Sequence, residues 1–205
     1  MSGRYATGGS QGLYQPGSGD QVLANKLGIT DPAEMDELEL ELLNKLYESV
    51  LLDELPVRAL TMADLQHWHY RWLGNVYDWA GSERSVNMSK GDFHFAAAAQ
   101  IPRLLASFER DYLARFTPCS GMSRTVLVEA IANCHVELIL IHPFREGNGR
   151  LSRLLADVMA VQAGREPLDY SSWEACKEEY IKAIHSGLDC DYRAMQYWVD
   201  RALSD

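Results

Sequence analysis

HPFREGNGRLSR occupies residues 142–153 of this chain and brings together a titratable base, a carboxylate, two glycines and three arginines. Gly147 and Gly149 bracket Asn148 directly before an apolar run with helical spacing, so we expect a turn that opens a helix here. The N–H groups at the start of a helix, together with the positive end of its dipole, bind anions. The stretch therefore predicts a loop-to-helix junction that handles phosphate.

Three kinds of side chain in this stretch suit a di- or triphosphate. Arg150 and Arg153 lie three positions apart, hence on one face of the first turn, and their planar forks match phosphate oxygens. Glu146 could hold a hard cation such as Mg²⁺ between its carboxylate and the phosphates of the substrate. His142 precedes a proline, which disfavours helical geometry, and an imidazole with a pKa near ~6.5 can accept a proton at physiological pH. We predict a base beside a phosphate site.

A structural interpretation competes with this one, because a buried histidine, a glycine pair and solvated arginines use the same residue types. The spacing favours the functional interpretation, since no requirement of the fold places all of them in one stretch. His67 and His69 point to different sides of a helix and do not predict a metal site. His135, seven residues before His142, is interpreted as a core histidine in preference to a group that supports the site.

The composition predicts one domain with a sizeable core, from 205 residues of which 47% are hydrophobic. A net charge of −10 opposes nonspecific binding to nucleic acid or anionic membrane, so we expect a protein partner, no direct nucleic-acid binding and no membrane contact. The first residues lack the apolar core of a signal peptide, and no apolar stretch is long enough to span a bilayer. Four scattered cysteines without a C-x-x-C pair favour reduced thiols in the cytoplasm.

Helical signals dominate the chain, and we expect an all-α fold. Residues 1–20, rich in Gly, Ser and Tyr, should form a flexible N-terminal arm, and residues 21–205 a single domain. The expected helix starts are Asp31 before a proline, Thr61, and a capping box of Ser171 with Glu174. Further helices are expected over residues 100–116 and 123–141, after Gly149, and from Asp191.

Residues 83–95 interrupt the helical pattern. Apolar residues alternate with polar ones on both sides of Lys-Gly-Asp at positions 90–92, which predicts a short β-hairpin. The alternating residues are Val86, Met88, Phe93 and Phe95. A surface hairpin without a functional role is the alternative interpretation.

Residues 142–153 resemble the signature of Fic domains, H-x-F-x-[D/E]-G-N-G-R-x-x-R, at every fixed position, and the similarity extends from about Tyr14 to the C-terminus. The resemblance implies the Fic fold, a helical bundle with a β-hairpin flap at about residues 84–95 over the active site. It also implies a nucleotidyltransferase that transfers AMP from ATP to a hydroxyl side chain of a target protein. Related Doc proteins carry Lys in place of Gly149 and transfer phosphate, so Gly149 favours nucleotidyl transfer.

The family implies a role for each matched position. His142 would be the base that deprotonates the target hydroxyl, Phe144 would anchor the loop in the core, and Glu146 would hold Mg²⁺ or Mn²⁺. The residues expected to bind the phosphates are Gly147, Asn148, Gly149, Arg150 and Arg153, with the two arginines on the β- and γ-phosphates. The flap residues expected to grip the target backbone by strand addition are Val86, Asn87, Met88, Ser89 and Lys90.

Residues 22–29 resemble the entry segment of short bacterial Fic toxins. Family members of this kind are restrained by a helix with the motif [S/T]-x-x-x-E-[G/N], whose glutamate pairs with the second arginine of the signature. The nearest match, residues 125–130, ends in alanine, so we expect a separate small antitoxin whose inhibitory helix places a glutamate against Arg153. The family associates such toxins with type II topoisomerase subunits, which are therefore one candidate target.

Two other kinds of function stay open. The same scaffold could use another donor such as UTP, or run the reverse reaction as a de-AMPylase, because a phosphate cradle says little about the nucleobase. Outside enzymes, the alternative is a regulatory module that binds nucleotide without turnover. An intact His142 argues against that alternative, since a pure binder has no use for a base there.

Overall fold

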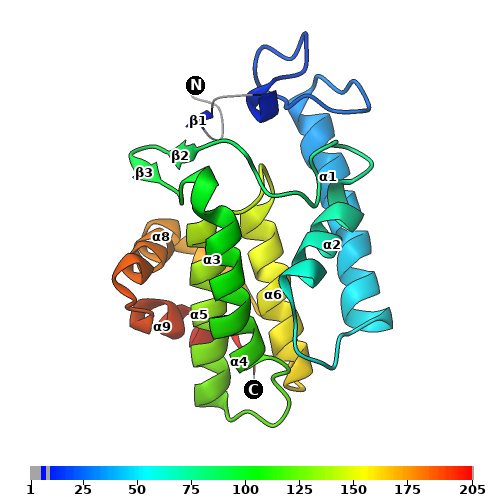
Figure 1. The fold of residues 1–205 in the computed structure, drawn as a ribbon. Helices are drawn as coiled ribbons and strands as arrows, with labels where there is room; N and C mark the ends of the chain where they lie inside the picture. Colours follow the sequence, from blue (N-terminus) through cyan, green and yellow to red (C-terminus); the bar gives the residue numbers. More distant parts are fainter. Residues whose placement is uncertain (1–5, 8–9, 205) are drawn as a thin grey trace.

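Helices form most of the chain, and α5 runs through the middle of the molecule (Figure 1). The computed structural model describes residues 6–7 and 10–204. Its helices are α1 (Pro32–Glu48), α2 (Met62–Leu73), α3 (Ile101–Phe108), α4 (Ala114–Phe116), α5 (Arg124–Ile141), α6 (Asn148–Gln162), α7 (Ser171–Ala175), α8 (Lys177–His185) and α9 (Arg193–Ala202). The expected all-α fold is confirmed.

Helix α5 is the core of the bundle because it contacts α3, α6, α8 and α9. A helix with neighbours on all sides needs apolar residues on all sides, and α5 carries them, for example Leu127, Ile131 and Leu138. Ser123 caps its start by accepting a hydrogen bond from the backbone N–H of Val126.

The starts of α1 and α2 follow the predicted capping chemistry. Oδ1 of Asp31 accepts hydrogen bonds from the N–H groups of Ala33 and Glu34, at 2.8 and 3.0 Å. Thr61 and Asp64 form a reciprocal capping box at the start of α2. Both helix starts are confirmed.

The predicted capping box of Ser171 with Glu174 is wrong. Helix α7 begins at Ser171 itself, and its N-cap residue Tyr170 makes no capping side-chain bond. Asp169 accepts the hydrogen bond of the Ser171 N–H at 2.9 Å, so an aspartate upstream satisfies this donor, while Glu174 pairs with an arginine of α6. The chain leaves helical geometry at Cys176 and starts again as α8.

Two other helix predictions hold with adjusted details. Residues 101–116 are helical throughout, but a wider π-helical turn at Glu109–Leu113 separates α3 from α4. Helix α9 begins at Arg193, two residues after Asp191, whose side chain accepts the N–H of Arg193 at 3.1 Å. Among the described residues, no helix is both long and apolar enough to cross a bilayer.

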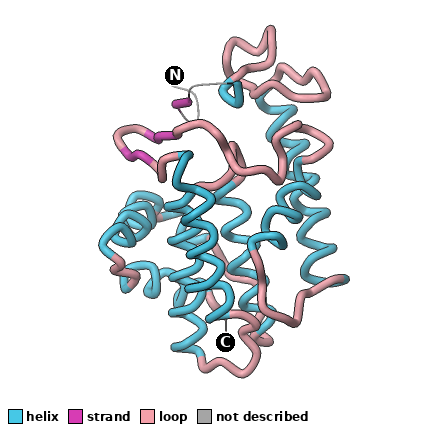
Figure 2. Tube along the Cα trace, in the orientation of Figure 1, coloured by secondary structure: helices cyan, strands magenta, loops and turns pink. Residues whose placement is uncertain are grey.

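The predicted hairpin is present as β2 (Met88–Lys90) and β3 (Phe93–His94), with Ser89 opposite His94. A third strand, β1 (Ala6–Thr7), pairs antiparallel with the other side of β2, which the sequence did not predict. The strand order is therefore β1-β2-β3, with β2 in the centre. Figure 2 shows the strands together at one end of the helical bundle.

The part of the expected arm that the structure describes lies against the domain. Gln11 accepts a hydrogen bond from the backbone N–H of Ser85 through its side chain, at 2.8 Å, and another from Nε of Arg145 through its carbonyl, at 2.7 Å. Tyr14 forms an antiparallel bridge with Leu23. Gln11 therefore connects the base of the hairpin to the segment between α5 and α6. The flexibility of residues 1–20 stays a prediction.

Candidate active site

The signature loop, residues 142–147, joins α5 to α6 and is bent sharply at both ends. His142 follows α5 in the left-handed region, with φ 51° and ψ 59°, so the helix ends at this residue. Gly147 precedes α6 with φ 81°, and a Cβ atom there would lie 2.5 Å from Cζ3 of Trp72. Glycine is thus required at 147 both by the backbone and by the neighbouring ring.

Side-chain contacts hold this loop closed. Oδ1 of Asn148 accepts the N–H of Phe144 at 2.8 Å, and its Nδ2 donates to the Phe144 carbonyl at 2.7 Å. The fully buried Phe144 ring stacks on His69, with ring centroids 4.0 Å apart. His69 accepts the N–H of Gly81 on Nδ1, so its Nε2 donates to the Glu146 carbonyl at 3.0 Å. The side chain of Asn148 therefore closes the loop, and the buried Phe144 ring packs against His69 of α2.

His142 is buried beside the hairpin. Its ring stacks on Phe95 with centroids 3.8 Å apart, and its Nδ1 lies 3.2 Å from the Ile139 carbonyl. A proton on Nδ1 satisfies that contact and leaves Nε2 as the basic nitrogen. Burial lowers the pKa of His142 to about 3, so the ring is neutral at physiological pH. A neutral imidazole is the form that can accept a proton.

A cavity of about 560 Å³ lies between the signature loop, the hairpin and α7–α8. This volume is in the range of sites for small molecules. His142, Gly149 and Arg153 line it from the loop and α6, and Lys90, Phe93 and Phe95 line it from the hairpin. The structure thus brings the expected base, one of the two arginines and part of the expected flap to one cavity.

Aromatic side chains of α7 and α8 complete the wall of this cavity. Trp173 stacks on Tyr180 with centroids 4.9 Å apart, and both line the cavity. His135 lies behind them, with Nε2 2.8 Å from the Tyr180 hydroxyl and Nδ1 3.2 Å from the Ser152 carbonyl. Burial lowers the pKa of His135 to about 4. It is a core histidine, as expected, and it also orients a residue of the cavity wall.

The two signature arginines face different carboxylates. Nη2 of Arg150 lies 2.6 Å from Oε2 of Glu39 on α1, and its guanidinium covers the ring of Trp72 at 4.6 Å. Arg153 lines the large cavity, with Nη1 3.0 Å from Oε1 of Glu174. Spacing along the helix placed the two forks on one face, but the structure brings only Arg153 to the cavity that His142 lines.

Sequence reasoning missed Glu39. This carboxylate is buried, with 3% of its side chain exposed, and it also accepts the Tyr77 hydroxyl at 2.7 Å. A signal was present, because Glu39 occupies the same stripe of α1 as the buried residues Met35, Leu43 and Leu46. A carboxylate in an apolar stripe requires a buried partner, but the sequence did not show that the partner is Arg150.

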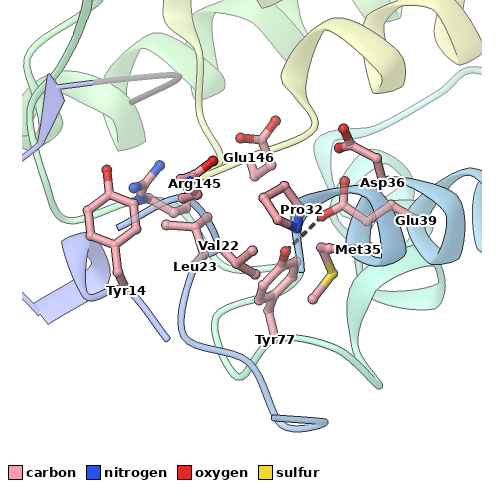
Figure 3. Close-up of a pocket in the computed structure, with 11 residues that line it drawn as sticks. Tyr14, Val22, Leu23, Pro32, Met35, Asp36, Glu39, Tyr77, Arg145 and Glu146 are labelled. Carbon is pink, nitrogen blue, oxygen red and sulfur yellow. Dashed lines mark hydrogen bonds between the residues drawn. The ribbon is translucent and has the colours of Figure 1, made fainter. Parts of the chain in front are cut away.

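Glu146 lines a second, smaller cavity of about 190 Å³, together with Arg145 of the loop and Asp36 and Glu39 of α1 (Figure 3). Its Oε1 accepts the N–H of Gly147 at 3.0 Å. Among the described residues, no group of three His, Cys, Asp or Glu side chains could hold a metal ion. Magnesium in phosphate sites is often held by a single carboxylate and the phosphates themselves. One carboxylate next to an anion-binding turn fits that mode.

The first turn of α6 is the anion-binding element of the loop. The N–H groups at the start of a helix have no acceptor within the helix, and Gly147 at the N-cap has no side chain that could cap them. A Cβ atom on Gly149 would meet no atom within 4 Å, and Gly149 lines the large cavity. The start of α6 is therefore accessible from the side on which His142 lies.

The expected flap residues lie on and beside the central strand. Val86 and Met88 are buried. Ser89 and Lys90 follow Met88 in β2, and Lys90 lines the large cavity. Oδ1 of Asn87 accepts the N–H of Ala98 at 2.9 Å. Because β1 and β3 already flank β2, another strand can pair with β2 only if it replaces one of them, and β3 is joined to β2 by the hairpin turn.

Comparison with known proteins gives the site a context. A family model described as the Fic/DOC family matches residues 59–160. A probable protein adenylyltransferase of Sinorhizobium fredii is 34% identical over 76% of this chain and 79% of its own, and the probable protein adenylyltransferase Fic of Escherichia coli K12 is 28% identical over 100% and 98%. The crystal structure of the BepC protein of Bartonella tribocorum with bound AMPPNP matches with a TM-score of 0.74 at 23% identity, over 95% of this chain and 97% of that one.

Proposed function

This chain belongs to the Fic/DOC family, and we propose that it transfers AMP from ATP to a hydroxyl side chain of a target protein. It is a protein adenylyltransferase, an enzyme of the nucleotidyltransferase class. The observation that carries the proposal is the large cavity, where a neutral histidine and the start of α6 meet.

In the proposed reaction, Nε2 of His142 takes the proton of the target hydroxyl while the hydroxyl oxygen bonds to the α-phosphorus of ATP. The bond between that phosphorus and the bridging oxygen breaks, and pyrophosphate leaves. The N–H groups at the start of α6 hold the phosphates, with Asn148 contributing through its backbone because its side chain closes the loop. Arg153 holds the terminal phosphate, and Arg150 contributes after exchange of its partner Glu39.

Glu146 would hold Mg²⁺ or Mn²⁺ together with the phosphates of ATP. The ion supplies positive charge that stabilises the negative charge developing on the leaving pyrophosphate. The support is chemical: Glu146 is a carboxylate at the anion-binding turn, within 3.0 Å of the N–H of Gly147.

The target backbone would pair with β2 of the flap, since Lys90 and Phe95 of the flap lie at the same cavity as His142. Because β1 occupies this side of β2, we propose that the target displaces β1. Removal of residues 1–9 should then lower the KM for the target and leave the Kd for ATP unchanged, and an unchanged KM would exclude this binding edge.

We further propose a cytoplasmic toxin restrained by a small antitoxin, with type II topoisomerase subunits as candidate targets. In support, Arg153 donates to the Glu174 carboxylate in this structure, so it could donate to a carboxylate of an inhibitory helix as well. Co-expression with the gene that neighbours it on the chromosome, scored by growth, would test the toxin role separately from the enzymatic one.

The enzymatic proposal is tested with a bacterial lysate and ATP labelled on the α-phosphate. The wild-type chain should label a small set of proteins, and His142→Ala should lose ~10²–10⁴-fold in rate while its Kd for ATP stays close to wild type, because the imidazole acts on the hydroxyl and not on the phosphates. His67→Ala, on the exposed side of α2, is the control. Labelling by the His142→Ala variant at the wild-type rate would exclude the mechanism. Labelled UTP and pre-labelled proteins as substrates separate the alternative donor and the de-AMPylase.

A further inference from the structure

Arg84 is a buried arginine at the base of the flap, with 2% of its surface exposed. Its side chain reaches the end of α5: Nε donates to the His142 carbonyl at 2.6 Å and Nη2 to the Ile141 carbonyl at 3.3 Å. The other contacts lead to the flap, where Nη1 donates to the Val86 carbonyl and Nη2 to the Ala96 carbonyl, at 2.5 and 2.6 Å. All four acceptors are backbone carbonyls.

These four contacts connect the two parts of the active site. Val86 precedes β2 and Ala96 follows β3, so the guanidinium holds both ends of the flap. The same group holds the carbonyl of His142, the proposed base. The backbone reinforces this connection, because the N–H of Arg84 donates to the Pro143 carbonyl at 2.7 Å. A shift of the flap relative to His142 would therefore break hydrogen bonds of one side chain.

The chemistry of the contacts requires arginine. The last carbonyls of a helix carry the negative end of its dipole, which favours a cation at the end of α5. Burial lowers the pKa of Arg84 to about 10, which leaves it charged at physiological pH. A guanidinium spreads five N–H donors in one plane, whereas a lysine ammonium has three donors at one point and cannot reach carbonyls on several sides.

We propose that Arg84 is a positioning residue, which sets the distance between the flap that holds the target backbone and the imidazole that takes the proton. This inference rests on the proposed function. Transfer depends on the alignment of the imidazole, the target hydroxyl and the α-phosphate of ATP. A displacement of about 1 Å can reduce a rate by about 10²-fold. In the contacts described above, Arg84 touches neither the large cavity nor the side chains that line it. Loss of Arg84 should therefore affect AMP transfer and not ATP binding.

The test compares Arg84→Lys and Arg84→Gln with Arg110→Lys, a control at an exposed ion pair with Asp111. All variants are assayed at one temperature, at least about 10 °C below the lowest Tm among them, so that global unfolding does not contribute and the rates can be compared. Three quantities are measured: the Kd for ATP by calorimetry, the rate of lysate labelling with α-labelled ATP, and hydrogen exchange of the flap amides, residues 86–96, against those of α6.

For both Arg84 variants we expect labelling to fall by about 10²-fold, with the Kd for ATP within about threefold of wild type. Flap amides should exchange at least about tenfold faster while α6 amides keep their protection. Unchanged flap exchange would overturn the positioning role. So would a parallel loss of ATP affinity and α6 protection, or failure of both variants to fold, because Arg84 would then be a general structural residue. Absence of labelling by the wild-type chain would count against the proposed function. The hydrogen exchange of the flap amides would then still test whether Arg84 holds the flap to the signature loop.

Discussion

Replacement of Gly147 by alanine should destabilise the protein, whereas the same change at Gly149, two residues later, should not. At Gly147 the new Cβ atom would lie 2.5 Å from Cζ3 and 2.9 Å from Cη2 of Trp72, at a backbone φ of 81°. The left-handed conformation costs a non-glycine residue about 1–2 kcal/mol, and an overpacked buried site costs about 1–3 kcal/mol more. We therefore expect Gly147→Ala to lower the free energy of unfolding by about 2–5 kcal/mol.

Gly149 lies in the first turn of α6 with ordinary helical geometry, and a Cβ atom there would meet nothing within 4 Å. Alanine at this position should raise the free energy of unfolding by up to about 1 kcal/mol, through its higher helix propensity. The methyl group would project into the cavity that Gly149 lines, so the Kd for ATP should rise in spite of the gain in stability.

Urea unfolding at pH 7, followed by circular dichroism, measures both free energies, and the pair of variants separates a general effect of alanine from the contact with Trp72. Equal stability of Gly147→Ala and wild type would refute this reasoning about the loop. A double-mutant cycle with Trp72→Phe adds a check: Gly147→Ala should cost less stability in the Trp72→Phe background than in the wild-type background, because the smaller ring lacks the atoms that the new Cβ atom meets.

The remaining predictions concern pH and two carboxylates. Burial holds the pKa values of His69, His135 and His142 at about 4, 4 and 3, so the folded state does not take up the protons that the unfolded chain binds below pH 6.5. Stability should therefore hold above pH 6.5 and fall as pH drops, by about 2 kcal/mol per histidine at pH 5. Burial raises the pKa of Asp157 to about 6, so this carboxyl stabilises the fold as pH drops and offsets about 1 kcal/mol of the loss at pH 5. Equal free energies of unfolding at pH 7 and pH 5 would contradict this prediction. Glu174→Ala should tighten ATP binding up to about fivefold, because Glu174 forms an exposed ion pair with Arg153 and so competes with the phosphate for it. The control variant Glu178→Ala should leave ATP binding unchanged. Weaker ATP binding by Glu174→Ala would argue against a phosphate at Arg153. Glu146→Ala should lose most of its metal-dependent labelling, and full activity of wild type in chelator would remove the metal from the proposal.

Local chemistry was sufficient to predict most helices of this fold, its hairpin and the loop of its site. The capping residues Asp31 and Thr61 act on N–H groups two to three residues away, so their effect can be read from the sequence. The turn at Gly147 and the helix after it follow from neighbouring residues in the same way. The capping box at Ser171 failed because Asp169, just upstream, competes for the same donor, a competition that the motif alone does not reveal.

Partners that are distant in the chain were decided by the tertiary structure. Arg150 pairs with Glu39, 111 residues away, and Arg84 holds the carbonyl of His142, 58 residues away. Strand β1 reaches β2 across more than 80 residues, and this pairing decides which edge of the flap a target can use.

The sequence by itself therefore determined the helical elements, the hairpin and the composition of the signature loop, since each depends on backbone geometry and side chains within a few residues. Tertiary structure alone decided that His142 is buried and neutral, that Arg153 and not Arg150 lines its cavity, and that Arg84 connects the loop to the flap. The physical reason is the same in each case. Burial and long-range hydrogen bonds depend on which helices pack together. That packing minimises the exposed apolar surface of the whole chain. No single motif contributes enough of this surface to predict which helices will pack together.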